Sequence, residues 1–374
     1  MIYQGDCLDI LPTLEANSID SIVTDPPYGL SFMGKDWDHG VPGVHFWVEA
    51  LRVAKPGAYL LAFGGTRTFH RLAVAIEDAG WEIRDCLGWL YGSGFPKSHN
   101  IGNGFGTALK PAWEPIILAR KPFKSTVADN VLKYGTGAIN IDGCRVDTFQ
   151  PGELDRLKAR ADTPRQDFTG GRLHSGAEYT PKIIESGMSN KGRWPANLIH
   201  DGSQEVLELF PNTGNGVGQR TYDGSGSAAR FFYCAKASKA ERNRGCEGLE
   251  EKIQNNTETN SRTFNDRCLT CKKKFVGSDN TICHCPPELK ITDKTIYTNK
   301  NNHPTIKPIA LMEYLVKLVT REGQTVLDPF AGSGTTGIAC KNLNRNAILI
   351  EREGDYIEIA GRRISAVQPL FDGI

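Results

Sequence analysis

Apolar residues in the first 125 positions alternate between the spacing of a strand and the spacing of a helix. Strands are predicted at residues 1–6, 18–24, 58–65 and 81–91. Between them, apolar positions recur at helical spacing, which predicts a helical turn at 7–14 and helices at 43–57 and 66–80. The two longer helices run into glycine stops at Gly57 and Gly80.

The last part of the chain repeats this alternation. Helices are predicted at 309–320, 335–344 and 355–367, with strands at 325–330 and 346–351. Strands that alternate with helices of this length are typical of a parallel sheet covered by helices on both faces. We therefore predict an α/β fold with a doubly wound, Rossmann-like and mostly parallel sheet.

The middle of the chain, residues 126–300, differs in composition from the two ends. Gly, Ser, Asn and Asp are frequent there, and apolar periodicity is weak. This favours a loop-rich inserted region that serves recognition rather than core catalysis. The predicted division is 1–125, 126–300 and 301–374, with the two ends forming one sheet.

Charge and composition limit how the protein could bind nucleic acid and argue against a secreted or membrane protein. The chain has 44 Lys and Arg against 43 Asp and Glu, a net charge of +1. Nucleic-acid binding would therefore depend on local clusters rather than on a bulk positive field. The first ten residues lack the regions of a signal peptide, and no apolar run reaches the roughly eighteen residues of a membrane span. We expect a soluble, cytoplasmic protein.

The strand at 18–24 ends at Asp25, which is followed by Pro26, Pro27 and Tyr28. A carboxylate and a backbone carbonyl can each accept one N–H bond from an exocyclic amino group, which directs its lone pair outward. Prolines fix the direction of that carbonyl because their φ is set, and an aromatic ring can stack on an extruded base. The motif fits methylation of a conjugated amino group.

A second motif, Val326 to Thr336, reads as a strand, a Gly-rich turn and a helix. Gly332 and Gly334 permit a tight turn beneath a ligand, toward which the helix directs its N-terminus. The next strand ends at Glu351, an acid suited to paired ribose hydroxyls. The spacing does not match a Walker loop, so a nucleoside without a polyphosphate is the predicted ligand.

Together these motifs resemble those of DNA amino-methyltransferases that use S-adenosylmethionine. The order, with the catalytic motif first and the cofactor loop last, resembles the beta class. The resemblance implies catalysis by Asp25, Pro26, Pro27 and Tyr28. It implies cofactor contacts from both ends of the chain: Asp6, His303, Lys307, Asp328, Phe330, Gly332, Ser333, Gly334, Thr335 and Glu351.

The resemblance also assigns parts of the cofactor. Asp6 would contact its adenine, Glu351 its ribose hydroxyls, and Phe330 would pack beside it. The segment that holds His303 and Lys307 would approach the methionine end. The middle region would be the target-recognition domain.

In this family an Asp at the first motif position usually accompanies adenine, so N6 of adenine is the predicted target, reached by base flipping in duplex DNA. Cytosine N4 is the nearest alternative. An RNA or protein-amide methyltransferase, and a DNA-binding regulator with an inactive core, also stay open. A bacterial, archaeal or phage origin is implied, as is a homodimer, whereas a cognate restriction enzyme is left open.

Four of the ten cysteines crowd together, as Cys268, Cys271, Cys283 and Cys285. Two close pairs of thiolates across a short loop suit a tetrahedral zinc site. The second pair has one intervening residue rather than the two of a zinc-ribbon knuckle, and His284 is an alternative ligand. We predict one structural zinc ion.

Overall fold

The structure is a computed structural model of the 374-residue chain. The described residues are 1–30, 40–94, 96, 98–146, 192–213, 226–235, 241, 243–247, 249, 252–253, 298–299, 301, 303 and 306–367. The four clustered cysteines, Cys268, Cys271, Cys283 and Cys285, lie outside the described residues, as does His284.

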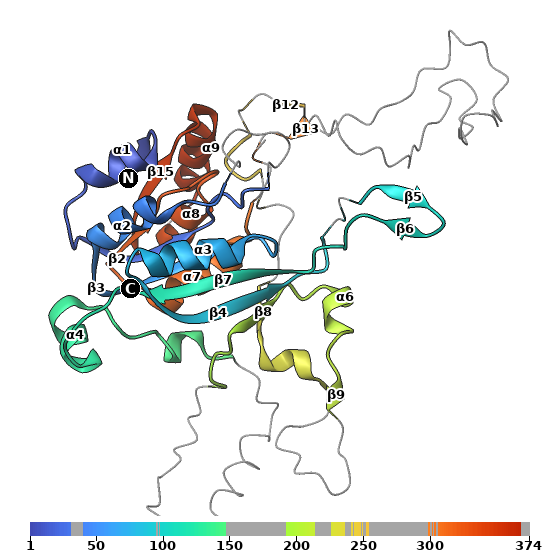
Figure 1. The fold of residues 1–374 in the computed structure, drawn as a ribbon, viewed down its shortest axis with the longest axis horizontal. Helices are drawn as coiled ribbons and strands as arrows, with labels where there is room; N and C mark the ends of the chain where they lie inside the picture. Colours follow the sequence, from blue (N-terminus) through green and yellow to red (C-terminus); the bar gives the residue numbers. More distant parts are fainter. Residues whose placement is uncertain are drawn as a thin grey trace, which may run out of the picture.

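A nine-stranded sheet, counted over the described residues, forms the centre of the molecule (Figure 1). Its order is β1 (Ile2–Gln4), β15 (Asn346–Glu351), β14 (Thr325–Asp328), β2 (Ile19–Thr24), β3 (Ala54–Phe63), β7 (Trp113–Arg120), β4 (Glu82–Leu90), β8 (Leu198–His200) and β11 (Tyr233–Cys234). All neighbours are parallel except β7, which is antiparallel to both β3 and β4. The mostly parallel α/β sheet predicted from the sequence is confirmed.

The two ends of the chain interleave in this sheet. β14, from the C-terminal part, pairs with β2, from the N-terminal part, so that Leu327 lies opposite Ile22. The strand order reverses around this pair, and ligands of open α/β sheets bind at such a point, beyond the carboxyl ends of the strands. The ends of β2 and β14 carry the two motifs found in the sequence.

Helices cover both faces of the sheet. Their bounds are α1 (Cys7–Ile10), α2 (Val44–Val53), α3 (Phe69–Asp78), α4 (Val127–Tyr134), α6 (Gln204–Leu207), α7 (Ile309–Val319), α8 (Thr335–Asn342) and α9 (Gly354–Ser365). Alternate residues of β3 enter two cores: Leu61 packs with α7 and α8, whereas Leu60 packs with α2 and α3. Each fully buried leucine contributes about 2 kcal/mol to folding, so both faces stabilise the sheet.

The middle region adds to the sheet as well as to loops. β8 pairs in parallel with β4, and β11 pairs with β8, so two strands from 126–300 extend the sheet edge. The sequence predicted a loop-rich insert in this range and did not predict these two strands. An exposed edge of β4 would leave its backbone groups without partners, and β8 supplies them.

Short elements complete the described structure. They are η1 (Leu11–Thr13), β5 (Asn100–Gly102), β6 (Phe105–Gly106), η4 (Asp142–Cys144), β9 (Asn212–Thr213), β10 (Gly226–Ser227), η5 (Ala228–Phe231), β12 (Lys252–Ile253) and β13 (Thr298–Asn299). No helix in the described part of the chain has both the length and the apolar character that crossing a bilayer requires.

Candidate active site

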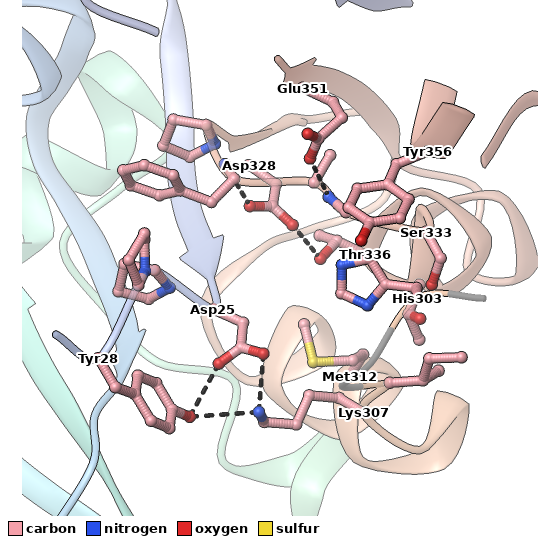
Figure 2. A pocket seen from close by; sticks show the side chains of 18 of the residues that line it. Asp25, Tyr28, His303, Lys307, Met312, Asp328, Ser333, Thr336, Glu351 and Tyr356 are labelled. Carbon is pink, nitrogen blue, oxygen red and sulfur yellow. Dashed lines mark hydrogen bonds and ion pairs between the residues drawn. The ribbon is translucent and has the colours of Figure 1, made fainter. Parts of the chain in front are cut away.

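One cavity of about 640 Å³ lies at the carboxyl ends of β2, β14 and β15. Both sequence motifs line it, the first through Asp25 to Tyr28 and the second through Asp328 to Ser333. Figure 2 shows Asp25 and Tyr28 on one side, with Asp328 and Glu351 on the other. A single cavity therefore joins the two motifs that are far apart in the sequence.

Asp25 is held at the end of β2, a strand whose six residues are all buried. The Oδ2 atom of Asp25 accepts from Lys307 Nζ at 2.7 Å, and Oδ1 accepts from the Tyr28 hydroxyl at 2.8 Å. Each carboxylate oxygen has two lone pairs and uses one here. Asp25 therefore keeps acceptor capacity toward the cavity.

Glu114, at the start of β7, completes a cluster of four side chains. Its Oε2 atom lies 3.0 Å from the Tyr28 hydroxyl and 3.3 Å from Lys307 Nζ. The Tyr28 hydroxyl is thus within hydrogen-bond distance of two carboxylates, Asp25 and Glu114, but has one proton to donate. Lys307 supplies the positive charge that holds the two carboxylates together.

The protonation states in this cluster follow from burial and charge. Burial, followed by the charges of Asp25 and Glu114, raises the pKa of Tyr28 well above its ordinary value, so its hydroxyl keeps its proton. Burial alone would lower the pKa of Lys307, but the two carboxylates raise it above its ordinary value. The approach of Lys307 to the methionine end of a cofactor stays a prediction; in the structure its ammonium lies on Asp25 and lines the cavity.

Asp328 organises the Gly-rich turn. Its Oδ1 atom accepts from Thr24 Oγ1 at 2.7 Å and from the Phe330 N–H at 3.1 Å, and its Oδ2 atom accepts from Thr336 Oγ1 at 2.5 Å. The carboxyl is buried, and that burial outweighs the hydrogen bonds and raises its pKa to about 6. Asp328 was predicted to contact cofactor and does line the cavity; its hydrogen bonds also tie β2 to the loop.

This buried acid predicts a pH dependence of stability. Between about pH 4 and about pH 6 the native state retains the Asp328 proton while the unfolded chain has lost it, so the free energy of unfolding should fall as pH rises. A shift from 3.8 to about 6 corresponds to on the order of 3 kcal/mol. Asp328→Asn should remove this slope. Urea unfolding at pH 4 and pH 7 measures the free energy of unfolding of the wild-type protein and of Asp328→Asn. An equal change with pH in the two proteins would contradict the assignment.

Gly332 and Gly334 both adopt positive φ, 51° and 77°. A Cβ at Gly332 would come within 2.6 Å of His303 Nε2, which lines the cavity. A Cβ at Gly334 would meet Ala360 of α9 at 2.8 Å, and Gly334 is absent from the cavity lining. The sequence placed both glycines beneath a ligand, but Gly334 instead permits close packing of the loop on α9.

Arg363, fully buried on α9, supports the same loop. Its Nη1 atom donates to the Ser333 carbonyl at 2.6 Å, to Ser333 Oγ at 2.9 Å and to Thr335 Oγ1 at 3.2 Å. Ser333 and Thr335 also line the cavity. One buried cation therefore fixes the loop shape from behind.

Glu351 lies at the end of β15, as predicted. Its Oε2 atom accepts from the Gly332 N–H at 2.8 Å, and Oε1 accepts from the Glu353 N–H at 2.9 Å. Burial raises the pKa of Glu351 above its ordinary value. Asp6 also lines the cavity, and its Oδ1 atom caps α1 by accepting from the Leu8 N–H at 2.9 Å.

Aromatic rings form part of the cavity wall. His303 packs edge-on against Tyr356, with ring centroids 4.5 Å apart, and both line the cavity. The ring of Phe330 packs on the ring of Phe46, with centroids 4.9 Å apart. The structure thus brings all the predicted catalytic and cofactor residues to one cavity except Gly334, which packs on α9 instead. Sequence reasoning missed Glu114, Tyr356 and Arg363.

Comparisons with known proteins agree with this arrangement. The DNA methylase family of N6 and N4 methyltransferases matches residues 19–362. The chain is 23% identical over 424 residues to the type II methyltransferase M.HindIII of Haemophilus influenzae, covering 97% of this chain and 94% of that protein. It is 40% identical over 115 residues to the type II methyltransferase M.HpaI of Haemophilus parainfluenzae, covering 30% of this chain and 37% of that one.

Solved structures show a distant likeness. The M1.HpyAVI–SAM complex is 18% identical with a TM-score of 0.41, covering 97% of this chain and 98% of that one. The cytosine-N4-specific PvuII DNA methyltransferase is 15% identical with a TM-score of 0.47, covering 100% and 87%. Since the family match spans nearly the whole chain and both motifs, this protein belongs to the DNA methylase family of N6 and N4 methyltransferases.

Proposed function

We propose that this protein transfers a methyl group from S-adenosylmethionine to N6 of adenine in duplex DNA. The observation that carries the proposal is the single cavity lined by both Asp25 and the Gly-rich loop. A cofactor on the loop and a base on Asp25 would share that space. The family match supports DNA as the substrate.

The cofactor side of the cavity fits a nucleoside. The Glu351 carboxylate accepts the Gly332 and Glu353 N–H groups, and since a carboxylate has about four acceptor sites, it keeps capacity for a ribose hydroxyl. Asp6 and Phe330 line the same side, and His303 and Tyr356 provide aromatic surface. When bound, S-adenosylmethionine supplies an electrophilic methyl group on its sulfonium.

On the other side, the remaining lone pairs of Asp25 would accept one N–H of the target amino group, and the Pro26 carbonyl the other. Tyr28 would stack on the base, with its hydroxyl fixed by Asp25 and Glu114. Lys307 would position Asp25. The amino group loses one proton as the new N–C bond forms, and Asp25 is placed to accept it.

The choice of adenine rests on Asp25, the residue that usually accompanies adenine at this motif position. The family includes both N6 and N4 methyltransferases, so cytosine N4 is the alternative. M.HindIII, aligned over nearly its whole length, is named a type II methyltransferase. We propose the same modification role here, with residues 126–300 reading the DNA sequence.

Transfer of label from methyl-labelled S-adenosylmethionine tests the substrate class. We expect uptake into duplex DNA and none into RNA or protein. Label in RNA or in a protein amide would identify the corresponding alternative. Binding of duplex DNA with no uptake into any substrate would indicate a regulator with an inactive core.

The predicted zinc site gives a separate expectation. Elemental analysis of the purified protein should find one zinc per chain, bound by Cys268, Cys271, Cys283 and Cys285. Because four thiolates fill a tetrahedral shell, the ion would be structural. Replacing Cys268 and Cys271 by Ser should release it and weaken DNA binding while the catalytic core stays folded. Protein without zinc or iron would refute the site.

A further inference from the structure

A two-stranded hairpin extends from the central sheet next to the cavity. Residues 98–109 form the β5–β6 hairpin, which connects β4 to β7. Figure 1 shows this hairpin reaching away from the sheet beyond the ends of β4 and β7. At its base, Ser93 and Pro111 both line the cavity, and the Tyr91 N–H donates to the Ala112 carbonyl at 3.0 Å. The hairpin is thus continuous with the wall of the active site.

The hairpin has a defined conformation. Asn103 and Gly104 both have positive φ, 53° and 80°, as a tight two-residue hairpin turn requires. Near its base, the His99 N–H donates to Thr107 Oγ1 and the Thr107 N–H donates to Ser98 Oγ, each at 2.9 Å. Backbone and polar side chains fix its shape without a hydrophobic core.

The large apolar side chains of the hairpin are mostly exposed. Ile101 is 69% exposed, Phe105 is 68% exposed and Leu109 is 92% exposed. Ile101 and Phe105 lie on either side of the turn, at the tip. Two strands alone bury little, so large apolar residues at such a tip gain little from folding. Their environment on the free protein is water.

The chemistry of the hairpin suits a nucleic acid. Residues 98–109 contain no Asp and no Glu, so no carboxylate opposes a phosphate backbone. Cβ atoms added at Gly102 and Gly104 would meet nothing within 4 Å, so the ribbon is narrow and unobstructed there. A narrow, acid-free ribbon with an apolar tip can enter a groove and insert between bases.

We propose that the β5–β6 hairpin inserts Phe105 and Ile101 into duplex DNA beside the target nucleotide, filling the space that the extruded base leaves. The inference rests on the proposed function. Extruding a base costs a few kcal/mol in lost stacking and pairing, and apolar side chains in the gap offset part of that cost. The hairpin begins at the cavity wall, where Ser93 and Pro111 line the cavity, so it would lie beside an extruded base.

Phe105→Ala tests the proposal on a duplex that the wild-type protein methylates. We expect kcat/KM on the matched duplex to fall about tenfold. This corresponds to a loss of about 1.4 kcal/mol in the stabilisation that Phe105 gives to DNA with an extruded base. The same variant should act normally on the single strand and recover on a duplex whose target base is mispaired. A 2-aminopurine at the target position should show a smaller fluorescence increase on binding.

Leu132→Ala is the matched control, because Leu132 is 85% exposed on α4, at the opposite end of the sheet (Figure 1). It should leave all four readouts unchanged. Normal activity of Phe105→Ala on the matched duplex, or an equal loss on single and double strands, would overturn the hairpin proposal alone. A wild-type protein that methylates no DNA would instead refute the proposed function.

Discussion

Asp25→Ala is expected to abolish methyl transfer while cofactor affinity stays within several-fold of wild type. The reason is geometric: the Asp25 carboxylate lies on the side of the cavity that we propose for the base, whereas the loop and Glu351 form the other side (Figure 2). Lys307 keeps Glu114 at 3.3 Å after the change, so it retains a counter-charge. Single-turnover methylation and calorimetric titration with cofactor measure the two effects.

Asp20→Asn is a suitable control for Asp25. Like Asp25, Asp20 is ion-paired to a lysine, Lys55 Nζ at 2.6 Å, but it is buried within β2 and does not line the cavity. The control should lose stability and keep turnover per folded molecule. More than a tenth of wild-type turnover in Asp25→Ala would remove Asp25 from its catalytic role.

Gly334→Val should have the second large effect, on both folding and cofactor binding. The residue has φ of 77°, and an added Cβ would lie 2.8 Å from the Ala360 Cβ. A β-branched residue at that φ, together with the clash, should cost about 3 kcal/mol or more. Displacing α9 also moves Arg363, which holds Ser333. Cofactor titration and thermal unfolding should both show the loss.

Gly361→Ala is the control, since a Cβ there meets nothing within 4 Å and the residue lies within α9. Alanine should be tolerated or slightly stabilising in a helix. If Gly334→Val bound cofactor normally with an unchanged melting temperature, the packing role of Gly334 would be incorrect.

The sequence predicted the parts of the sheet that have strong local signals. β2, β14 and β15 are apolar runs that end in Asp25, the Gly-rich turn and Glu351, and the structure brings these ends to one cavity. Parallel strands that alternate with helices place their carboxyl ends at one edge. The catalytic and cofactor motifs could therefore be placed together from their positions alone.

β7 was missed, and Glu114 with it. Pro115 near the start of β7 argues against a central strand, yet the structure pairs Pro115 with Gly88 of β4. Because β7 is antiparallel to β3, its first residues lie at the edge where β2 ends. An antiparallel assignment of this apolar run would have placed Glu114 beside Asp25.

Long-range polar contacts have no local signal. Lys307 lies 282 residues from Asp25, and Arg363 reaches Ser333 only because α9 packs behind the loop. A lysine before a proline usually lies at the solvated start of a helix. The residues next to Lys307 in the sequence therefore do not predict its ion pair with Asp25. Gly334 shows the same limit, since its close neighbour is on α9.

The most direct test of the central claim is the identity of the methylated nucleoside. Duplex DNA incubated with the protein and S-adenosylmethionine is digested to nucleosides, which are identified by mass. N6-methyladenine should appear with the wild-type protein and be absent with Asp25→Ala. N4-methylcytosine without N6-methyladenine would contradict the adenine assignment, and unmodified DNA would contradict the proposed activity itself.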